Sequence, residues 1–340
     1  MKLVSRPALG AKARCRLVKG HIHGSHSPFL EEKRIAEITT KDRVLTHAGR
    51  FRPVLAAGSR PYDGDLVGIK ATGLPEVLAT PNHPFLARAT GRIWNNDRRG
   101  YDRTPAPEKW TVAGSVERGT FLRIPLPVEA DGAMPGYLIP DHDPRLWWIV
   151  GFWLAEGWRN TKARARRGLV GAARGAAANT LREPMGWRVT FCCNDRERER
   201  VEGRIRERFS LTPAVERTVT KLIVTDESLW TLLGHFGGGA AKKKIPSWVY
   251  GLPLACRAAL LEGYIDGDGH RFSDRESGRA GAWTATTISI ALARGVQLLA
   301  FGVEGRLPSV YQSHEARTCV IEGRTVSAKK TYMVRQQTSH

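Results

Sequence analysis

Cysteines are few in this sequence, and their spacing argues against two classes of protein. The 340 residues include five cysteines. No two of them form a Cys-x-x-Cys pair, which argues against a structural zinc site. An odd, irregularly spaced set also lacks the framework of a disulfide-stabilised secreted domain. The cysteine usage therefore favours a reduced, intracellular protein.

Long apolar stretches are missing as well. The longest strongly apolar run, Leu146 to Ala155, is much shorter than the roughly 20 residues that a membrane-spanning helix needs. The N-terminal residues are basic but include no apolar segment typical of a signal peptide. We therefore expect no membrane association and a cytoplasmic or nucleoid-associated location.

Acidic residues are outnumbered by basic ones. The chain has 53 Lys and Arg against 33 Asp and Glu, a formal net charge of +20 at pH 7. The basic residues are spread along the whole chain, so they do not form a separate charged tail. This charge favours a polyanionic partner, most commonly nucleic acid. The length predicts two or three domains.

One stretch near residue 265 combines helical periodicity with an unexpected glycine. Leu261, Tyr264 and Ile265 recur at helical spacing and predict an apolar stripe on a helix. Gly263 lies within that stripe, where glycine costs about 1 kcal/mol relative to alanine. We therefore expect Gly263 to permit close approach of a second helix.

The same helix is predicted to end in an acidic residue. Asp268 lies between Gly267 and Gly269, which leave its carboxylate at the end of the helix. A looser copy of the pattern occurs upstream, where Glu156 is followed by Gly157.

Each acidic residue has a glycine five positions before it, Gly151 in one copy and Gly263 in the other. Two such helices can pack face to face through these glycines and bring Glu156 and Asp268 together. Adjacent carboxylates repel each other unless a cation lies between them. The arrangement is suited to a divalent metal and to phosphodiester hydrolysis.

At these residues the chain resembles the LAGLIDADG (dodecapeptide) homing endonucleases. The run Asp266-Gly267-Asp268-Gly269 is close to the family consensus, and Glu156-Gly157 is an ordinary looser version of it. One copy is weak support, whereas two copies 112 residues apart are fairly specific.

The resemblance implies a fold and an activity. Glu156 and Asp268, with the adjoining Gly157 and Gly269, would hold Mg²⁺ beneath the scissile phosphates. The protein would make a site-specific double-strand break in a long, asymmetric DNA target. Because both motif copies lie in one chain, it would act as a monomer with two active sites.

The order of expected elements after residue 136 also indicates a repeat. We expect an α+β fold with two pseudo-symmetric αββαββα units, residues 136–250 and 251–340, whose sheets form a DNA-binding saddle. The first motif helix is expected to begin at Asp143 and Pro144, as cap and first residue. After the first motif we expect strand 187–191, helix 195–209, strands 213–218 and 221–225 and helix 228–236. After the second motif we expect strand 283–290, helix 292–303 and strands 306–311 and 330–334.

The family commonly places one lysine per repeat near the metals. Lys221 lies 65 residues after Glu156, and Lys330 lies 62 residues after Asp268, with Lys329 as the next choice. Their role would be to stabilise charge or to polarise the attacking water. An exposed or phosphate-facing strand lysine is an equally good interpretation of each.

Further basic residues are predicted to contact DNA. The segment around Lys243 resembles the Lys-x-Ile-Pro-x-Trp segment of intein-encoded family members, although a solvated basic loop also explains it. Asp266 is expected to end a helix or to lie behind the metal ligands. The predicted DNA contacts are Arg188, Lys221, Lys242, Lys243, Lys244 and Arg271.

Residues 1–135 read as a separate β-rich domain. Short apolar runs, 43–46, 66–70 and 76–80, alternate with glycine and proline turns. The series resembles the front half of a Hint (hedgehog/intein) domain. Thr80 and His83 match its Thr-x-x-His block, and Cys15 lies near the position of a splice-site cysteine.

The Hint resemblance breaks at the other end of the chain. An intein closes with His-Asn, and this sequence contains no such pair. Splicing needs the cyclisation of that Asn, so we expect a splicing-incompetent remnant in which Thr80 and His83 are structural.

Three other classes of protein are compatible with the sequence to different degrees. An EF-hand loop at Asp266 is rejected because Arg271 and Ser277 replace the required Gly and Glu. A non-cleaving DNA- or RNA-binding protein of maturase-like or regulatory type stays open. So does a self-cleaving Hint protein acting at Cys15.

Overall fold

The computed structural model describes most of the chain. The described residues are 4–6, 35–97, 99–126, 142–160, 186–210, 213–216, 221–272, 281–321 and 324–337. Cys15, and most of the arginine-rich stretch that follows the first motif, lie outside them. The chain divides into two compact units: residues 1–137 with 245–251 and 304–311, and the remainder.

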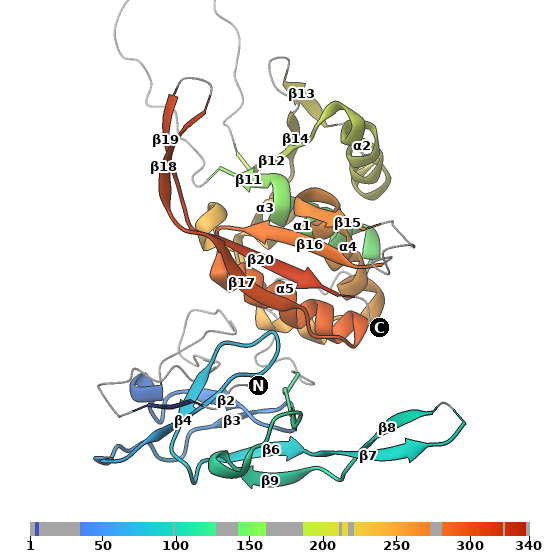
Figure 1. Ribbon diagram of the computed structural model, residues 1–340. Coiled ribbons are helices and arrows are strands. Elements are labelled where there is room, and N and C mark those ends of the chain that lie inside the picture. Colours follow the sequence, from blue (N-terminus) through green and yellow to red (C-terminus); the bar gives the residue numbers. More distant parts are fainter. Residues whose placement is uncertain are drawn as a thin grey trace, which may run out of the picture. The chain divides into compact units, whose positions relative to one another are not determined.

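Up to residue 126, the described part of the first unit consists of β-strands and two short 3₁₀ turns, η1 (Ile35–Glu37) and η2 (Ala113–Ser115); its later segments hold η4 (Ser247–Gly251) and the start of β17 (Ser309–His314). It has two three-stranded sheets, of order β1-β4-β5 and β10-β6-β9, and two hairpins, β2-β3 and β7-β8 (Figure 1). Its strands are β1 (Val4–Arg6), β2 (Arg43–Leu45), β3 (Phe51–Pro53), β4 (Leu66–Ile69), β5 (Val77–Ala79), β6 (Pro84–Arg88), β7 (Thr90–Asn95), β8 (Gly100–Pro105), β9 (Lys109–Val112) and β10 (Phe121–Leu122).

A small apolar core holds this unit together. Ile69, Ala79, Ala113 and Val116 are buried, and Phe85 packs against them. These residues come from three strands and the η2 turn, so the core joins the two sheets. The β-rich character expected of this part of the chain is therefore present among the described residues.

The second unit is built on two long helices, α1 (Pro144–Glu156) and α4 (Leu254–Asp268). The α1 helix begins where the sequence predicts: Asp143 caps it by accepting a hydrogen bond from the backbone N–H of Arg145, and Pro144 fills the first position. Gly157 and Gly269 follow the last residues of the two helices as their C-caps.

Each helix leads into a four-stranded sheet. The α1 half, from α1 to α3, has sheet order β11-β12-β14-β13, and the α4 half, from α4 to β20, has order β15-β16-β20-β17. Both halves begin with the order helix, strand, strand, helix, strand (Figure 1); the α1 half then has one strand and the helix α3, whereas the α4 half has three strands. The elements are β11 (Gly157–Arg159), β12 (Arg188–Cys192), α2 (Asp195–Phe209), β13 (Ala214–Glu216), β14 (Lys221–Thr225) and α3 (Glu227–Gly234), then β15 (Gly269–Arg271), β16 (Trp283–Thr287), α5 (Ile290–Glu304), β17 (Ser309–His314), β18 (Arg317–Ile321), β19 (Arg324–Ala328) and β20 (Thr331–Gln336). Two 3₁₀ turns, η3 (Ala240–Lys242) and η4 (Ser247–Gly251), precede α4.

The predicted mixed α+β class is confirmed, and several boundaries agree with the sequence. Helix 195–209 and strand 221–225 have the expected ends. Strand β16 stops three residues earlier than expected, because Ser289 turns the chain into α5 by accepting a hydrogen bond from the N–H of Leu292. The division into repeats 136–250 and 251–340 stays a prediction.

The two antiparallel hairpins β7-β8 and β18-β19 were not expected from the sequence. Each pairs two strands over five or six residues, and β18-β19 lies between β17 and β20 in the chain. No helix in the described part of the chain is long and apolar enough to cross a membrane.

Candidate functional site

Helices α1 and α4 cross in close contact at two glycines. A Cβ on Gly151 would overlap the carbonyl oxygen of Leu260, and a Cβ on Gly263 would overlap the carbonyl oxygen of Trp148. Each glycine thus lies against the backbone of the other helix. The close approach predicted for Gly151 and Gly263 is confirmed, since no side chain fits at either position.

The crossing brings the acidic ends of the helices together. One turn beyond Gly263, a Cβ on Gly267 would lie 2.5 Å from the Cβ of Ala155 and 3.4 Å from the Cγ of Glu156. Burial and, to a smaller extent, the charge of Glu156 raise the pKa of Asp268 to about 7, against the opposing effect of Lys243. Burial also raises the pKa of Glu156. Two carboxyl groups with raised pKa values therefore adjoin at the helix ends.

Lys243 lies beneath this acidic pair. Its side chain is 3 % exposed. The ammonium Nζ donates to the carbonyl oxygens of Trp153 and Leu154, each at 2.9 Å, and of Gly157 at 2.8 Å. The three carbonyls close the C-terminal end of α1, where the negative end of the helix dipole favours a cation. Burial lowers the pKa of Lys243 to about 8, and the charges of Asp268 and Glu156 oppose that shift.

This position corrects the expectation that Lys243 faces DNA. All three of its N–H donors are used inside the protein, whereas Lys242 is exposed and Lys244 is half-buried. The segment folds inward after Gly237, which has a φ of +93° and lies so close to the carbonyl of Lys242 that a Cβ would overlap it. The Lys-x-Ile-Pro-x-Trp resemblance falls on Lys243, but only the tertiary structure shows that this lysine points inward.

The same contact involves Gly157. Its carbonyl oxygen accepts a hydrogen bond from the Lys243 ammonium at 2.8 Å, and its place beside a metal stays a prediction. Gly269 stays a predicted metal neighbour. Among the described residues there is no group of three or more His, Cys, Asp or Glu side chains suited to a metal. Two carboxylates completed by substrate phosphates and water is a usual coordination for Mg²⁺, so Glu156 and Asp268 fit that ion.

Lys221 lies on the sheet of the α1 half, close to Glu156. It opens β14 opposite Cys192, and the charges of both Lys221 and Glu156 act on the Cys192 thiol. Its Nζ lies 5.8 Å from the ring centre of the exposed Trp158, on the strand that continues from α1. Arg188, Thr190 and Cys192 occupy alternate positions of β12, so their side chains lie on the same face of the sheet. Lys221 and Arg188 thus lie on one face of this sheet.

Lys330 does not hold the matching position in the α4 half. It precedes β20 and forms an ion pair with Glu315 at 3.1 Å, with both side chains more than half exposed. Gly157 lies opposite Phe191 and Gly269 opposite Ala285, so Cys192 corresponds to Thr286. The residue opposite Thr286 is Met333.

Arg271 is also placed differently from expectation. It lies opposite Trp283, which in turn lies opposite Gln336, and both of these are buried. Paired residues share a face of the sheet. Arg271 is exposed but projects from the edge of the face that carries Trp283, not the face that carries Thr284.

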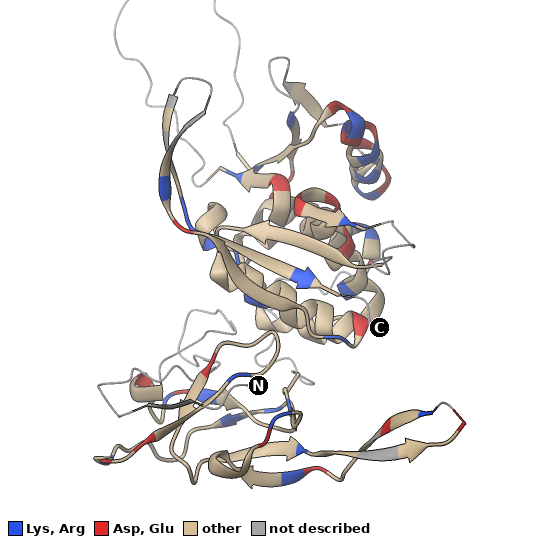
Figure 2. Ribbon diagram, viewed as in Figure 1, with Lys and Arg blue, Asp and Glu red and all other residues tan. Residues whose placement is uncertain are grey.

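Asp266 is held by two donors beside α1. Its Oδ2 accepts the indole N–H of Trp148 at 3.1 Å and a guanidinium N–H of Arg200 at 3.2 Å. Arg200 comes from α2, on which acidic and basic side chains are intermixed (Figure 2). Asp266 therefore links α4 to α1 and α2.

The first unit contains the other predicted residues. The N–H of His83 donates to the carbonyl of Thr80 at 2.9 Å, the Thr80 hydroxyl donates to Asn82 at 2.7 Å, and the His83 ring packs edge-on against Phe85. These contacts form a tight turn. They agree with the structural role expected for Thr80 and His83.

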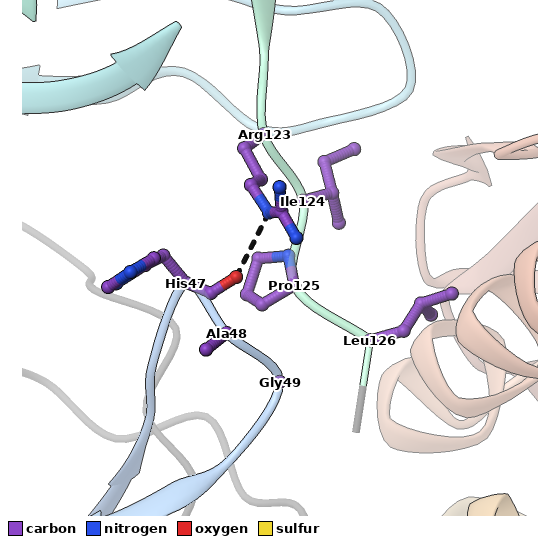
Figure 3. A pocket seen from close by; sticks show the side chains of 7 residues that line it. All are labelled: His47, Ala48, Gly49, Arg123, Ile124, Pro125 and Leu126. Carbon is purple, nitrogen blue, oxygen red and sulfur yellow. Dashed lines mark hydrogen bonds between the residues drawn. The ribbon is translucent and has the colours of Figure 1, made fainter. Parts of the chain in front are cut away.

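A shallow pocket lies elsewhere in this unit. It is lined by His47, Ala48, Gly49, Arg123, Ile124, Pro125 and Leu126. The Nε–H of Arg123 donates to the His47 carbonyl at 3.0 Å across it (Figure 3). Arg123 also forms an ion pair with Glu108 at 2.8 Å. The guanidinium is thus committed to protein partners, and the pocket lacks an acid–base pair for chemistry.

Comparison with known proteins bears on the second unit. Residues 255–330 match the model of the LAGLIDADG-like domain. The match begins at the start of α4 and includes Asp268, β15–β19 and α5. The family resemblance seen in the sequence is thereby supported for the α4 half, and proteins with such domains include nucleases and other DNA-binding proteins.

Two curated proteins are similar to parts of the chain. An uncharacterised protein of Methanocaldococcus jannaschii, MJ0043, is 44 % identical over 59 residues, which cover 17 % of this chain and 8 % of that protein. The ATP-dependent DNA helicase Hel308 of Thermococcus kodakarensis is 25 % identical over 330 residues, which cover 83 % of this chain and 27 % of the helicase. The chain therefore spans only a small part of each relative.

Proposed function

We propose that this protein is a site-specific, metal-dependent endodeoxyribonuclease that makes a double-strand break in a long DNA target. The observation that carries the proposal is the glycine-mediated crossing of α1 and α4, which joins Glu156 and Asp268 at the helix ends. The match to the LAGLIDADG-like domain supports the same reading. Because one chain supplies both carboxylates, the proposed active form is a monomer with two active sites.

The acidic pair supports metal binding by its electrostatics. The pKa of Asp268, near 7, records the free-energy cost of ionising two adjacent carboxylates in a partly buried place. A divalent cation would remove that cost. Mg²⁺ bound there would supply activation of a water and stabilisation of charge on the phosphate and the departing 3′ oxygen.

The protein's own residues would then have distinct tasks. Glu156 and Asp268 would hold the cation from the ends of α1 and α4. Lys243 fixes the end of α1 from below and offsets part of the negative charge. Lys221, on the adjoining sheet face, would stabilise the charge that develops on the phosphate or polarise the attacking water.

The charge of the chain supports DNA as the substrate. A net charge of +20 favours binding to phosphates, and antiparallel two-stranded ribbons fit the major groove of DNA. Basic residues occur on β18 and β20 (Figure 2). We propose that the sheets of the α1 and α4 halves form a pseudo-symmetric saddle over the duplex.

The extent of the helicase alignment supports a module that also occurs within a larger protein. The alignment covers 83 % of this chain but 27 % of the helicase, so most of this chain is similar to one part of a larger protein. We propose that the first unit is a Hint-like module that accompanies the nuclease.

The test is cleavage of DNA by the full chain. Duplexes enriched by binding in Ca²⁺ from a random pool would be incubated with Mg²⁺ and either wild type or Asp268→Asn. We expect discrete double-strand ends with the wild type and at least a 100-fold slower reaction with the variant. Tight, salt-sensitive binding without cleavage by the wild type would leave a non-cleaving DNA-binding protein as the correct reading.

A further inference from the structure

The sheets of the α1 and α4 halves can be aligned residue by residue from their registers. Gly157 and Gly269, which follow the two acids, lie opposite Phe191 and Ala285. Those residues in turn lie opposite Leu222 and Val334. Residues of one sheet thus have counterparts in the other sheet, and strand pairing alone defines them.

This correspondence pairs a lysine with a methionine. One residue before Leu222 is Lys221, and one residue before Val334 is Met333. Both lie 65 residues after the acid of their own half, Glu156 or Asp268. The equal spacing agrees with the registers and excludes Lys330, which lies 62 residues after Asp268 and forms an ion pair with Glu315.

The two side chains differ in what they can do near a phosphate. Lysine carries a positive charge and three N–H donors, whereas the methionine thioether is uncharged and has no donor. Met333 therefore cannot stabilise negative charge or polarise a water by donating a hydrogen bond. It is half-buried, as Lys221 is, so the difference is one of chemistry and not of exposure.

Other basic groups of the α4 half lie one step away. Arg335 lies opposite Thr284, which lies opposite His270, and their counterparts in the α1 half are Ile223 and Trp158. The guanidinium of Arg335 adds positive charge to this face of the α4 sheet and can attract phosphate.

We propose that the two strands of the target are cut at unequal rates, with the α1 half fast and the α4 half slow, because Met333 occupies the position of Lys221. This inference rests on the proposed nuclease function. At each strand a water oxygen forms a bond to phosphorus, the bond from phosphorus to the 3′ oxygen breaks, and a proton from the water passes to the departing oxygen. The reaction at the α4 half lacks the lysine's assistance, and a nicked duplex accumulates.

The experiment follows both strands of one duplex. The enriched duplex carries a different 5′ fluorophore on each strand and is cut under single-turnover conditions in Mg²⁺ by wild type, Lys221→Met and Met333→Lys. Lys41→Met, which changes an exposed lysine of the first unit, is the matched control. Circular dichroism of each variant reports retention of the fold.

We expect the wild type to cut one strand at least about 10-fold faster than the other, given the usual size of such assistance. Lys221→Met should slow the fast strand to about the slow rate, and Met333→Lys should accelerate the slow strand. Lys41→Met should behave as wild type. Equal strand rates in the wild type, or an unchanged ratio in folded Met333→Lys, would overturn the inference while leaving a nuclease. Absence of cleavage by every protein would overturn the nuclease function itself, and the inference with it.

Discussion

The buried ammonium of Lys243 and the carboxylate of Asp268 form the electrostatic centre of the second unit. Lys243 donates to three carbonyls at the end of α1, and this arrangement fixes the residue that follows Glu156. Replacing such a cation by a neutral residue leaves three acceptors buried without a donor. Lys243 therefore links folding of the basic segment to the geometry of the acidic site.

The raised pKa of Asp268 predicts a pH-dependent stability. Its pKa rises from 3.8 to about 7 on folding, so its contribution to stability is fully present below pH 3.8 and is lost as pH rises through 7. Without metal, the melting temperature of the wild type should fall relative to that of Asp268→Asn by about 3 °C between pH 5 and 7.5. Thermal unfolding in EDTA measures this.

Two further observations bear on that prediction. Added Mg²⁺ should reduce the difference, because it binds the ionised carboxylate. A difference in melting temperature between wild type and Asp268→Asn that stays constant across the pH range would show that folding does not raise the pKa of Asp268. The scan stops at pH 7.5 because Lys243, with its pKa lowered to about 8, begins to lose its proton above that value.

At the scale of elements, the α1–α4 contact holds the second unit together. A glycine in each helix lies against the backbone of the other, so the two axes approach more closely than any other residue would allow. The acids are one turn and a half further on, which places them side by side. The helix crossing is thus both the core of the unit and the support of the site.

Gly263→Ala should destabilise the protein strongly. The new Cβ would overlap the carbonyl oxygen of Trp148, and overpacking against backbone costs about 3 kcal/mol. Urea unfolding followed by tryptophan fluorescence measures the loss. The matched control is Gly203→Ala in α2, where no atom lies within 4 Å of the new Cβ. It should stabilise by about 0.5–1 kcal/mol. Equal effects of the two substitutions would contradict the close crossing.

At the scale of the whole molecule, charge should dominate binding to nucleic acid. The excess of 53 basic over 33 acidic residues is spread through the chain. Binding that neutralises many phosphates releases counterions and therefore depends steeply on salt. Charge of this kind gives affinity for any duplex, whereas recognition of one sequence needs contacts to base edges.

We expect the affinity of the full chain for a random 30-base-pair duplex to fall about 10³-fold or more between 50 and 200 mM salt. Fluorescence anisotropy at several salt concentrations measures the slope. Binding to poly-glutamate, measured in the same way, is the control for attraction to a polyanion that is not a duplex. An affinity that hardly changes with salt would argue against the electrostatic role proposed for the basic residues.

Much of the second unit follows from local sequence patterns. Asp143 and Pro144 begin α1, and the glycines after the two acids end the motif helices, because capping and glycine chemistry act over a few residues. The glycine positions five residues before each acid also predicted the helix crossing. The hairpins β7-β8 and β18-β19 were missed, because exposed strands with mixed polar composition lack the alternation that marks a half-buried strand.

The sequence by itself determined the acidic pair, the two helices that carry it and the α+β class, because spacing of glycines and acids along a helix is a one-dimensional pattern. Only the tertiary structure decided which lysines matter. The sequence places the whole run Lys242 to Lys244 on DNA, whereas burial turns Lys243 inward to the end of α1. Likewise, the sequence suggested Lys330 as the counterpart of Lys221, whereas the strand register places Met333 there, opposite Thr286. Burial and register depend on contacts between distant segments, and no local pattern of residues encodes them.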